Sequence, residues 1–436
     1  MHEVKPLTGL AWLIITHIKI LGVFTTVMIT VAMLTLLERK LSAWIQDRYG
    51  PNRVGPSGLL QPIADGLKNI MKEETFPSAS SAFFFFLAPA LAIIPSLVTI
   101  AVIPLAAPLP TRWGVVPMVL ADIPIGILFI LALTSLGVYG IVMAGWASNN
   151  KYAFLGGLRA SAQMVSYEVA LGMSLIPVFM IAGNVTLTQI VWSQQGVMHL
   201  WFALPLGLSF LLFVIAAFAE CNRLPFDLAE AESELITGYH TEYSSMKFSM
   251  FFIAEYSNML TASALMATLF LGGWDIPGSF DNMRMVAPNL IEGAQPAVWK
   301  TLLTLGAFAL KTFLFIALFM WVRWTVPRFR YDQVMHLGWK VMLPTALAYI
   351  MVTGTTILVL DQMGVRMGGF LGGAYGWTLV IVNAVCTFIF VRLLDNDRIM
   401  SGSSPRIYRS MQTPAGVRIE SRTAANKEPQ PRHQEA

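Results

Sequence analysis

Residues 82–106 read AFFFFLAPALAIIPSLVTIAVIPLA, a run of apolar residues without one charged side chain. The hydrocarbon core of a bilayer is about 30 Å thick and is crossed by about 20 helical residues, so this run is long enough to span it. The whole chain has the same character, with 56% hydrophobic and 12% charged residues among 436. Soluble domains carry about 25% charged residues, so the composition excludes an ordinary soluble domain.

Apolar windows of similar length recur along the chain, and no internal repeat is visible. They predict nine spans, at about 12–37, 82–106, 117–146, 161–183, 200–220, 247–272, 301–323, 341–360 and 376–394. A transmembrane β-barrel would show short alternating segments instead of long continuous apolar runs. We therefore expect an all-α polytopic membrane protein. Residues 1–394 would form the transmembrane domain, and the polar residues 395–436 a cytoplasmic, disordered tail.

Lysine and arginine give these spans a direction. Outside the spans they gather in the loop after the first span, in every second loop after it and in the tail. Because positive residues mark the cytoplasmic side, we expect the amino terminus outside and the carboxyl terminus inside. The assignment requires an odd number of spans.

Residue types that hold redox cofactors are scarce in this sequence. The two cysteines, Cys221 and Cys386, form no CxxC pair, and the six histidines lack metal spacing. No GxGxxG or Walker sequence is present. We expect this chain to bring no redox centre, so that a partner supplies electrons or energy, unless an ion gradient does.

The loop after the first span contains a candidate amphipathic helix. Glycines and prolines in residues 50–58 predict a sharply turning loop, and Pro62 suits the first turn of a following helix. One face of that helix is apolar, while Asp65, Lys68 and Lys72 lie elsewhere. Periodicity alone favours a plain interfacial anchor for it.

Acidic residues are concentrated between and inside the fifth and sixth spans. Seven lie in the stretch ECNRLPFDLAEAESELITGYHTEYSSMKFSMFFIAEY: Glu220, Asp227, Glu230, Glu232, Glu234, Glu242 and Glu255. An ionised carboxylate beside or inside a bilayer must be paired, hydrated or used to move protons.

A helix opening at Pro225 would place three of these acids on one face. Asp227, Glu230 and Glu234 follow the i, i+3, i+7 spacing, whereas Glu232 points away. Clustered carboxylates cannot all ionise independently, so such a group can share protons near neutral pH. The alternative is a solvated acidic loop or a docking face for a partner.

Other charged residues lie deep in apolar sequence. They are Lys19, Glu38, Arg39, Glu168, Glu255, Lys311 and Arg323. Each could be half of a structural ion pair or a side chain that reaches the interface. For Glu168, which is far from either end of its span, the functional interpretation leads.

Four strings resemble the H subunit of NADH:quinone oxidoreductase, respiratory complex I. They are ERKLSAWIQDRYGPNRVGPSGLLQPIADGLK, GGLRASAQMVSYEVA, the acidic stretch quoted above, and MWVRWTVPRFRYDQVMHLGWKVMLP. They occur in the family's order, and the resemblance covers about residues 12–360. It implies eight transmembrane helices at the heel of an L-shaped complex in the bacterial inner membrane, forming much of the quinone chamber.

The resemblance also implies roles for particular residues. At the quinone passage it places Glu38, Arg39, Arg53, Asp65 and Lys68. In proton coupling it places Glu168, Glu220, Asp227, Glu230, Glu232, Glu234, Glu242 and Glu255. As basic counter-charges it implies Arg323, Arg328 and Arg330.

Substrate, cofactors and partners follow from the same resemblance. Quinone would be the substrate, and the iron–sulfur clusters and FMN would belong to partner subunits. Those partners would be peripheral-arm iron–sulfur and quinone-site subunits and small membrane-arm subunits, together with membrane lipid and without nucleic acid.

Two features depart from the family pattern. They are the ninth span with its tail, and a long outer loop at 273–300. Three alternatives stay open: the heel subunit of a related membrane-bound hydrogenase, a free-standing cation/proton transporter and a non-catalytic assembly anchor. Acids concentrated in a loop, and not at broken helices near the membrane midplane, argue against the transporter.

Overall fold

The computed structural model describes part of the chain. The described residues are 2–3, 9–195, 201–227, 238–276, 283–287, 290–293, 295–365 and 373–395. Contacts divide the chain into two compact units, Met1–Val391 and Arg392–Ala436. Everything below concerns the first unit, apart from the last residues of one helix.

Long helices dominate the described residues. They are α1 (Gly9–Ile45), α3 (Ala82–Val98), α4 (Gly126–Ala147), α5 (Lys151–Ala182), α8 (Ser245–Phe270), α9 (Val298–Thr325), α11 (Leu343–Gln362) and α12 (Gly373–Asp395). Four helices are shorter: α2 (Gln61–Met71), α6 (Leu187–Gln194), α7 (Gly207–Glu220) and α10 (Tyr331–His336). Short 3-10 turns lie at Pro56–Gly58, Thr99–Val102 and Gly238–His240, and a π-helical turn, Leu337–Met342, joins α10 to α11.

The described strands are short and lie outside the helix bundle. β2 (Leu109–Thr111) pairs antiparallel with β3 (Gly114–Val116). β5 (Leu290–Gly293) pairs antiparallel with both β1 (His2–Glu3) and β4 (Met283–Ala287). The prediction of an all-α polytopic membrane protein is confirmed.

Seven stretches are long and apolar enough to cross a membrane. Among the described residues these are Gly9–Ile45, Ala82–Val102, Gly126–Ala147, Lys151–Ala182, Val298–Thr325, Tyr331–Gln362 and Gly373–Arg392. The expected spans at 200–220 and 247–272 coincide with α7, which has only 14 residues, and with α8. Nine crossings therefore remain a prediction.

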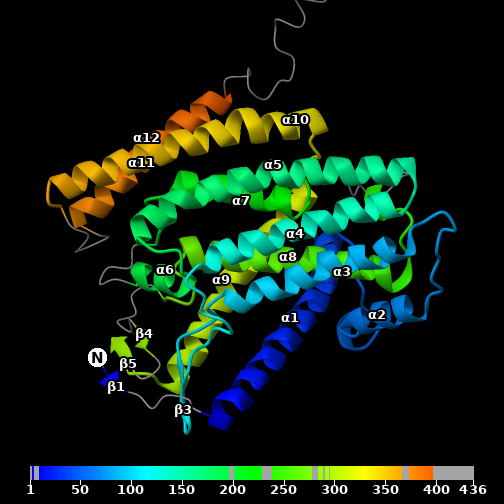
Figure 1. Cartoon of the computed structure of the whole chain (residues 1–436), viewed down its shortest axis with the longest axis horizontal. Coiled ribbons are helices and arrows are strands. Elements are labelled where there is room, and N and C mark those ends of the chain that lie inside the picture. Colours follow the sequence, from blue (N-terminus) through cyan, green and yellow to red (C-terminus); the bar gives the residue numbers. More distant parts are fainter. Residues whose placement is uncertain are drawn as a thin grey trace, which may run out of the picture. The chain divides into compact units, whose positions relative to one another are not determined.

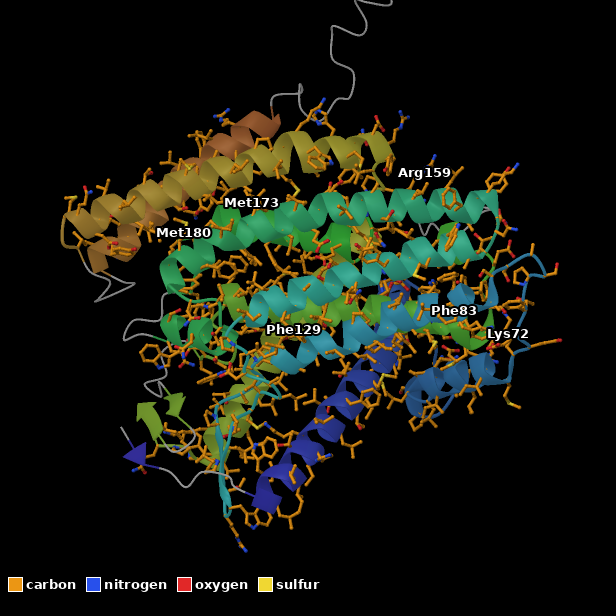
Figure 2. The ribbon with its side chains drawn as sticks, in the orientation of Figure 1. Lys72, Phe83, Phe129, Arg159, Met173 and Met180 are labelled. Atoms are coloured by element: carbon orange, nitrogen blue, oxygen red, sulfur yellow. The ribbon has the colours of Figure 1, made fainter. Side chains whose placement is uncertain are left out.

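The helices pack side by side around a continuous apolar core. Figure 1 shows α3, α4 and α5 in succession, with α11 beyond α5 and α8 behind α3; each of these neighbouring pairs is in contact. α1 runs across this set and contacts α8, α9 and α2. Many large apolar side chains project outward, as Figure 2 shows for Phe83 on α3, which is 70% exposed. Such outer faces suit a lipid environment.

α1 extends beyond its predicted span. The apolar window ends at residue 37, but the helix continues to Ile45 because no proline or glycine interrupts it. Glu38 and Arg39 consequently stand inside a regular helix. Glu38 is buried there, at 5% exposure.

Candidate functional site

A large cavity lies between α1, α2, α8 and α9. Its volume is about 640 Å³, and its wall combines apolar residues of α1, such as Met28 and Val31, with aromatic residues of α8, such as Phe252. Binding pockets for small molecules have volumes of roughly 300–1,000 Å³ and mostly apolar walls with a few polar groups. We call this cavity the chamber.

The amphipathic helix predicted from Pro62 forms one wall of the chamber. α2 begins at Gln61, and its polar residues Asp65 and Lys68 line the cavity. The Asp65 carboxylate is 2.5 Å from the Arg39 guanidinium of α1, so an ion pair links the two helices. Leu67 of α2 is 55% exposed. α2 is therefore both an apolar surface helix and a wall of a cavity.

Glu38 collects hydrogen bonds at the inner end of the chamber. The Tyr256 hydroxyl of α8 donates to its carboxylate at 2.6 Å. Arg223, in the loop after α7, donates to the same carboxylate at 3.2 Å, and Arg323 of α9 also donates to it. Four segments distant in sequence thus converge on one buried carboxylate.

Arg223 joins Glu38 to a second buried acid. Its Nε lies 2.7 Å from a carboxylate oxygen of Glu255 on α8, and its guanidinium lies 4.3 Å from the centre of the Tyr256 ring. Arg223 is only 3% exposed. A buried charge requires such pairing, because the desolvation of an isolated ion costs several kcal/mol.

The loop that carries Arg223 is fixed by Gln163 of α5. The Gln163 side-chain amide donates to the carbonyls of Ala219 and Phe226, at 3.0 and 2.9 Å, and to the Asn222 side chain at 3.2 Å. One buried amide therefore holds both sides of the turn after α7. This bonding places the Arg223 guanidinium toward α1 and α8.

A second, smaller cavity lies on the other side of Arg223. It has a volume of about 30 Å³ and is lined by Asp227, His240, Glu255 and Arg323, among others. Asp227 lies 3.7 Å from the Arg328 guanidinium. Burial lowers the pKa of His240 to about 4, so the imidazole is neutral near pH 7.

Glu220 and Glu168 form a separate acidic site. Glu220 ends α7, accepts a hydrogen bond from Thr134 of α4, and lies within electrostatic reach of Glu168 on α5. A cavity of about 30 Å³ adjoins Glu220 and is also lined by Cys221 and Thr134. A polar cavity of this size can hold water.

Several predicted site residues lie elsewhere or outside the described residues. Glu242 accepts a 2.7 Å hydrogen bond from Asn150, the residue that caps the start of α5. Arg53 and Arg330 are exposed, and neither lines the chamber. Glu230, Glu232 and Glu234, and with them the helical face proposed for the acidic loop, lie outside the described residues.

Four residues of the site were not selected from the sequence. Arg223, Tyr256 and His240 lie within the acidic stretch, whose carboxylates alone were taken as informative. A buried cluster of acids demands a basic partner, so Arg223 could have been selected on that argument. Gln163 offered no comparable signal, because an isolated glutamine has no charge or spacing that indicates its partners.

Metal ligation would require several donor side chains in one place. Within the described part of the chain, no group of three or more His, Cys, Asp and Glu side chains is placed to hold a metal ion. The acids and bases above offer hydrogen bonding, charge and proton exchange as their chemistry.

Comparisons with known proteins give a consistent result. The profile of the NADH dehydrogenase family matches residues 18–354. The first of two H subunits of NADH-quinone oxidoreductase from Geobacter metallireducens is 47% identical over 341 residues, covering 78% of this chain and 96% of that protein. The H subunit of NADH-quinone oxidoreductase from Flavobacterium psychrophilum is 48% identical over 349 residues, covering 80% of this chain and 98% of that protein. This chain belongs to the NADH dehydrogenase family, as an H subunit of NADH-quinone oxidoreductase.

Proposed function

We propose that the chamber binds the quinone ring and that the chain couples quinone reduction to proton translocation. The observation that carries this proposal is the position of Glu38. Its buried carboxylate faces a cavity of about 640 Å³ and is bonded to Tyr256 and Arg223. The cavity is large enough for a substituted ring, and groups that bond a quinone oxygen or exchange its protons lie at its inner end.

Reduction of quinone to quinol takes up two electrons and two protons. Electrons would arrive from a partner subunit, and the developing negative charge would fall beside Glu38 and Tyr256. Arg223 is shared between Glu38 and Glu255, so a change of charge at Glu38 alters its attraction for Glu255. Glu255, Asp227 and the acids of residues 228–237 would then exchange protons in response, and Glu220 with Glu168 would continue the route.

The chain would act within a larger assembly of the bacterial inner membrane. FMN and iron–sulfur clusters would lie in peripheral-arm subunits, the quinone site would be completed by one of them, and small membrane-arm subunits would flank the helices. The distribution of lysine and arginine supports an outer amino terminus and a cytoplasmic carboxyl terminus. Arg53, on the loop before α2, would face the peripheral arm.

A photoreactive quinone analogue tests the chamber directly. The analogue should label α1, α2 or α8 of this chain in the intact complex, and excess natural quinone should suppress the labelling. Tyr256→Phe should retain labelling but lower the maximal rate of quinone reduction, because it removes only a hydroxyl. Labelling confined to other subunits would contradict the proposal.

A further inference from the structure

α12 lies outside the part of the chain matched by the family profile, which ends at residue 354. The helix is apolar, yet it carries Asn383, which is only 9% exposed. A polar side chain inside a transmembrane helix is costly unless it is paired, and it then acts as a link between helices. The contacts of Asn383 therefore show what α12 does.

Asn383 bonds to the segment where α7 begins. Its side-chain oxygen accepts a hydrogen bond from the Leu208 backbone N–H at 2.9 Å, and its side-chain nitrogen donates to the Leu204 carbonyl at 3.0 Å. The Tyr349 hydroxyl of α11 donates to the same side-chain oxygen at 3.1 Å. One side chain thus joins α12, α11 and the start of α7.

The start of α7 requires a partner of this kind. The first backbone N–H groups of any helix have no acceptor within the helix. The residue before α7, Leu206, has an apolar side chain and makes no capping hydrogen bond. Asn383 serves as a cap supplied by another helix, since Leu208 N–H is one of these groups.

Gly207 allows the close approach of the two helices. A Cβ atom at this position would lie 2.9 Å from the side-chain nitrogen of Asn383, closer than real Cβ atoms come to other heavy atoms. Apolar contacts add to the polar ones. Leu379, one turn before Asn383, is 1% exposed and packs with Tyr375 and Leu360.

The other end of α7 leads into the site. α7 has 14 residues, so its axis is about 21 Å long. Glu220 is its last residue, and Arg223 follows within one turn. A short helix held at both ends transmits a displacement along its axis, so the position of its start bears on the position of Arg223.

We propose that α12 is a built-in positioning helix, in which Asn383 caps α7 and holds Arg223 between Glu38 and Glu255. Asn383 touches neither quinone nor the acids, so it is a positioning residue. This inference rests on the proposed function of the chamber only for its effect on turnover. The cap itself is measured separately.

Asn383→Leu in the intact complex tests the cap, because leucine has a similar size and cannot bond to the backbone. Hydrogen exchange at the Leu208 amide should become roughly tenfold faster, since a buried donor loses its acceptor. The maximal rate of quinone reduction and the protons pumped per electron should fall, while the Michaelis constant for quinone and electron transfer from NADH to ferricyanide should not change. Thr378→Val is the matched control, because the Thr378 hydroxyl donates to the Ala374 carbonyl of the same helix.

A pair of alanine substitutions provides a second test. Gly207→Ala should displace Asn383, and Asn383→Ala should remove its bonds. The double variant should lose less turnover than the two single variants combined, because the added methyl group occupies the space of the missing amide. If Asn383→Leu prevents assembly, Tyr349→Phe removes one bond without a loss of volume and should shift the same readouts less.

Specific outcomes would overturn the proposal. Unchanged exchange at Leu208 in Asn383→Leu would exclude the cap. Faster exchange with unchanged maximal rate and pumping would exclude the positioning role. Failure of quinone to label the chamber in the wild-type complex would instead reject the proposed function, and it leaves the exchange result independent.

Discussion

The Arg223 guanidinium lies 2.7 Å from the Glu255 carboxylate, joining the loop after α7 to the middle of α8. The same guanidinium reaches Glu38 at the inner end of the chamber. Two acids that face different cavities thus share one buried cation. The pairing offers a physical link between the quinone site and the acidic loop.

Arg223→Lys tests the shared cation. Lysine keeps the charge, but its single ammonium cannot reproduce the planar guanidinium that contacts both acids. Breaking a buried charge pair costs about 3–5 kcal/mol, so we expect quinone reduction to fall by at least roughly a hundredfold. NADH–ferricyanide activity should persist. The exposed Arg330→Lys is the matched control, and equal effects of the two substitutions would contradict the account.

Lys68→Trp tests the wall of the chamber. The bulky side chain should narrow the cavity and raise the Michaelis constant for a long-chain quinone more than for a short-chain analogue. Steady-state kinetics with both quinones measure the difference. Lys72→Trp, at the exposed end of α2 in Figure 2, should change neither constant. An equal increase for both quinones in Lys68→Trp would favour a plain interfacial anchor.

His240→Gln tests the buried neutral imidazole. Burial lowers the pKa of His240 from 6.5 to about 4, so protons bind preferentially to the unfolded state as the pH falls through this window. Stability should therefore decrease with falling pH in the wild type, and less steeply in His240→Gln. Thermal inactivation measured from about pH 7 to about pH 4.5 tests this window. His336→Gln is the control, and parallel pH profiles for wild type and His240→Gln would refute the prediction.

Fusion reporters test the predicted topology. A reporter after Arg398 should indicate the cytoplasm, and one between Asp361 and Tyr375 should indicate the outer side, since α12 lies between these points. Reporters of localised enzymatic activity measure each side. The same side for both would show that α12 does not cross the membrane.

Much of the fold was predictable from local sequence. Apolar length predicted the long helices, and the periodicity after Pro62 predicted α2, because both signals depend on neighbouring residues. α7 was the exception. It has only 14 helical residues within the window 200–220, because the chain forms non-helical turns before Gly207.

The site was predictable only in its residue types. Glu38 and Glu255 were selected as buried acids, but their connection through Arg223 requires segments 185 residues apart to meet. No local pattern encodes such a meeting. Asn383 illustrates the same limit, because one polar residue in an apolar run does not indicate which backbone it will cap.

Glu255→Gln in the intact complex, reconstituted into liposomes, tests the central claim most directly. The substitution keeps the size of the side chain but removes its charge and its exchangeable proton. The account predicts loss of quinone-linked turnover and of proton pumping, with NADH–ferricyanide activity retained and with the exposed Glu73→Gln behaving as wild type. Full quinone reduction and unchanged pumping per electron in Glu255→Gln would contradict the account.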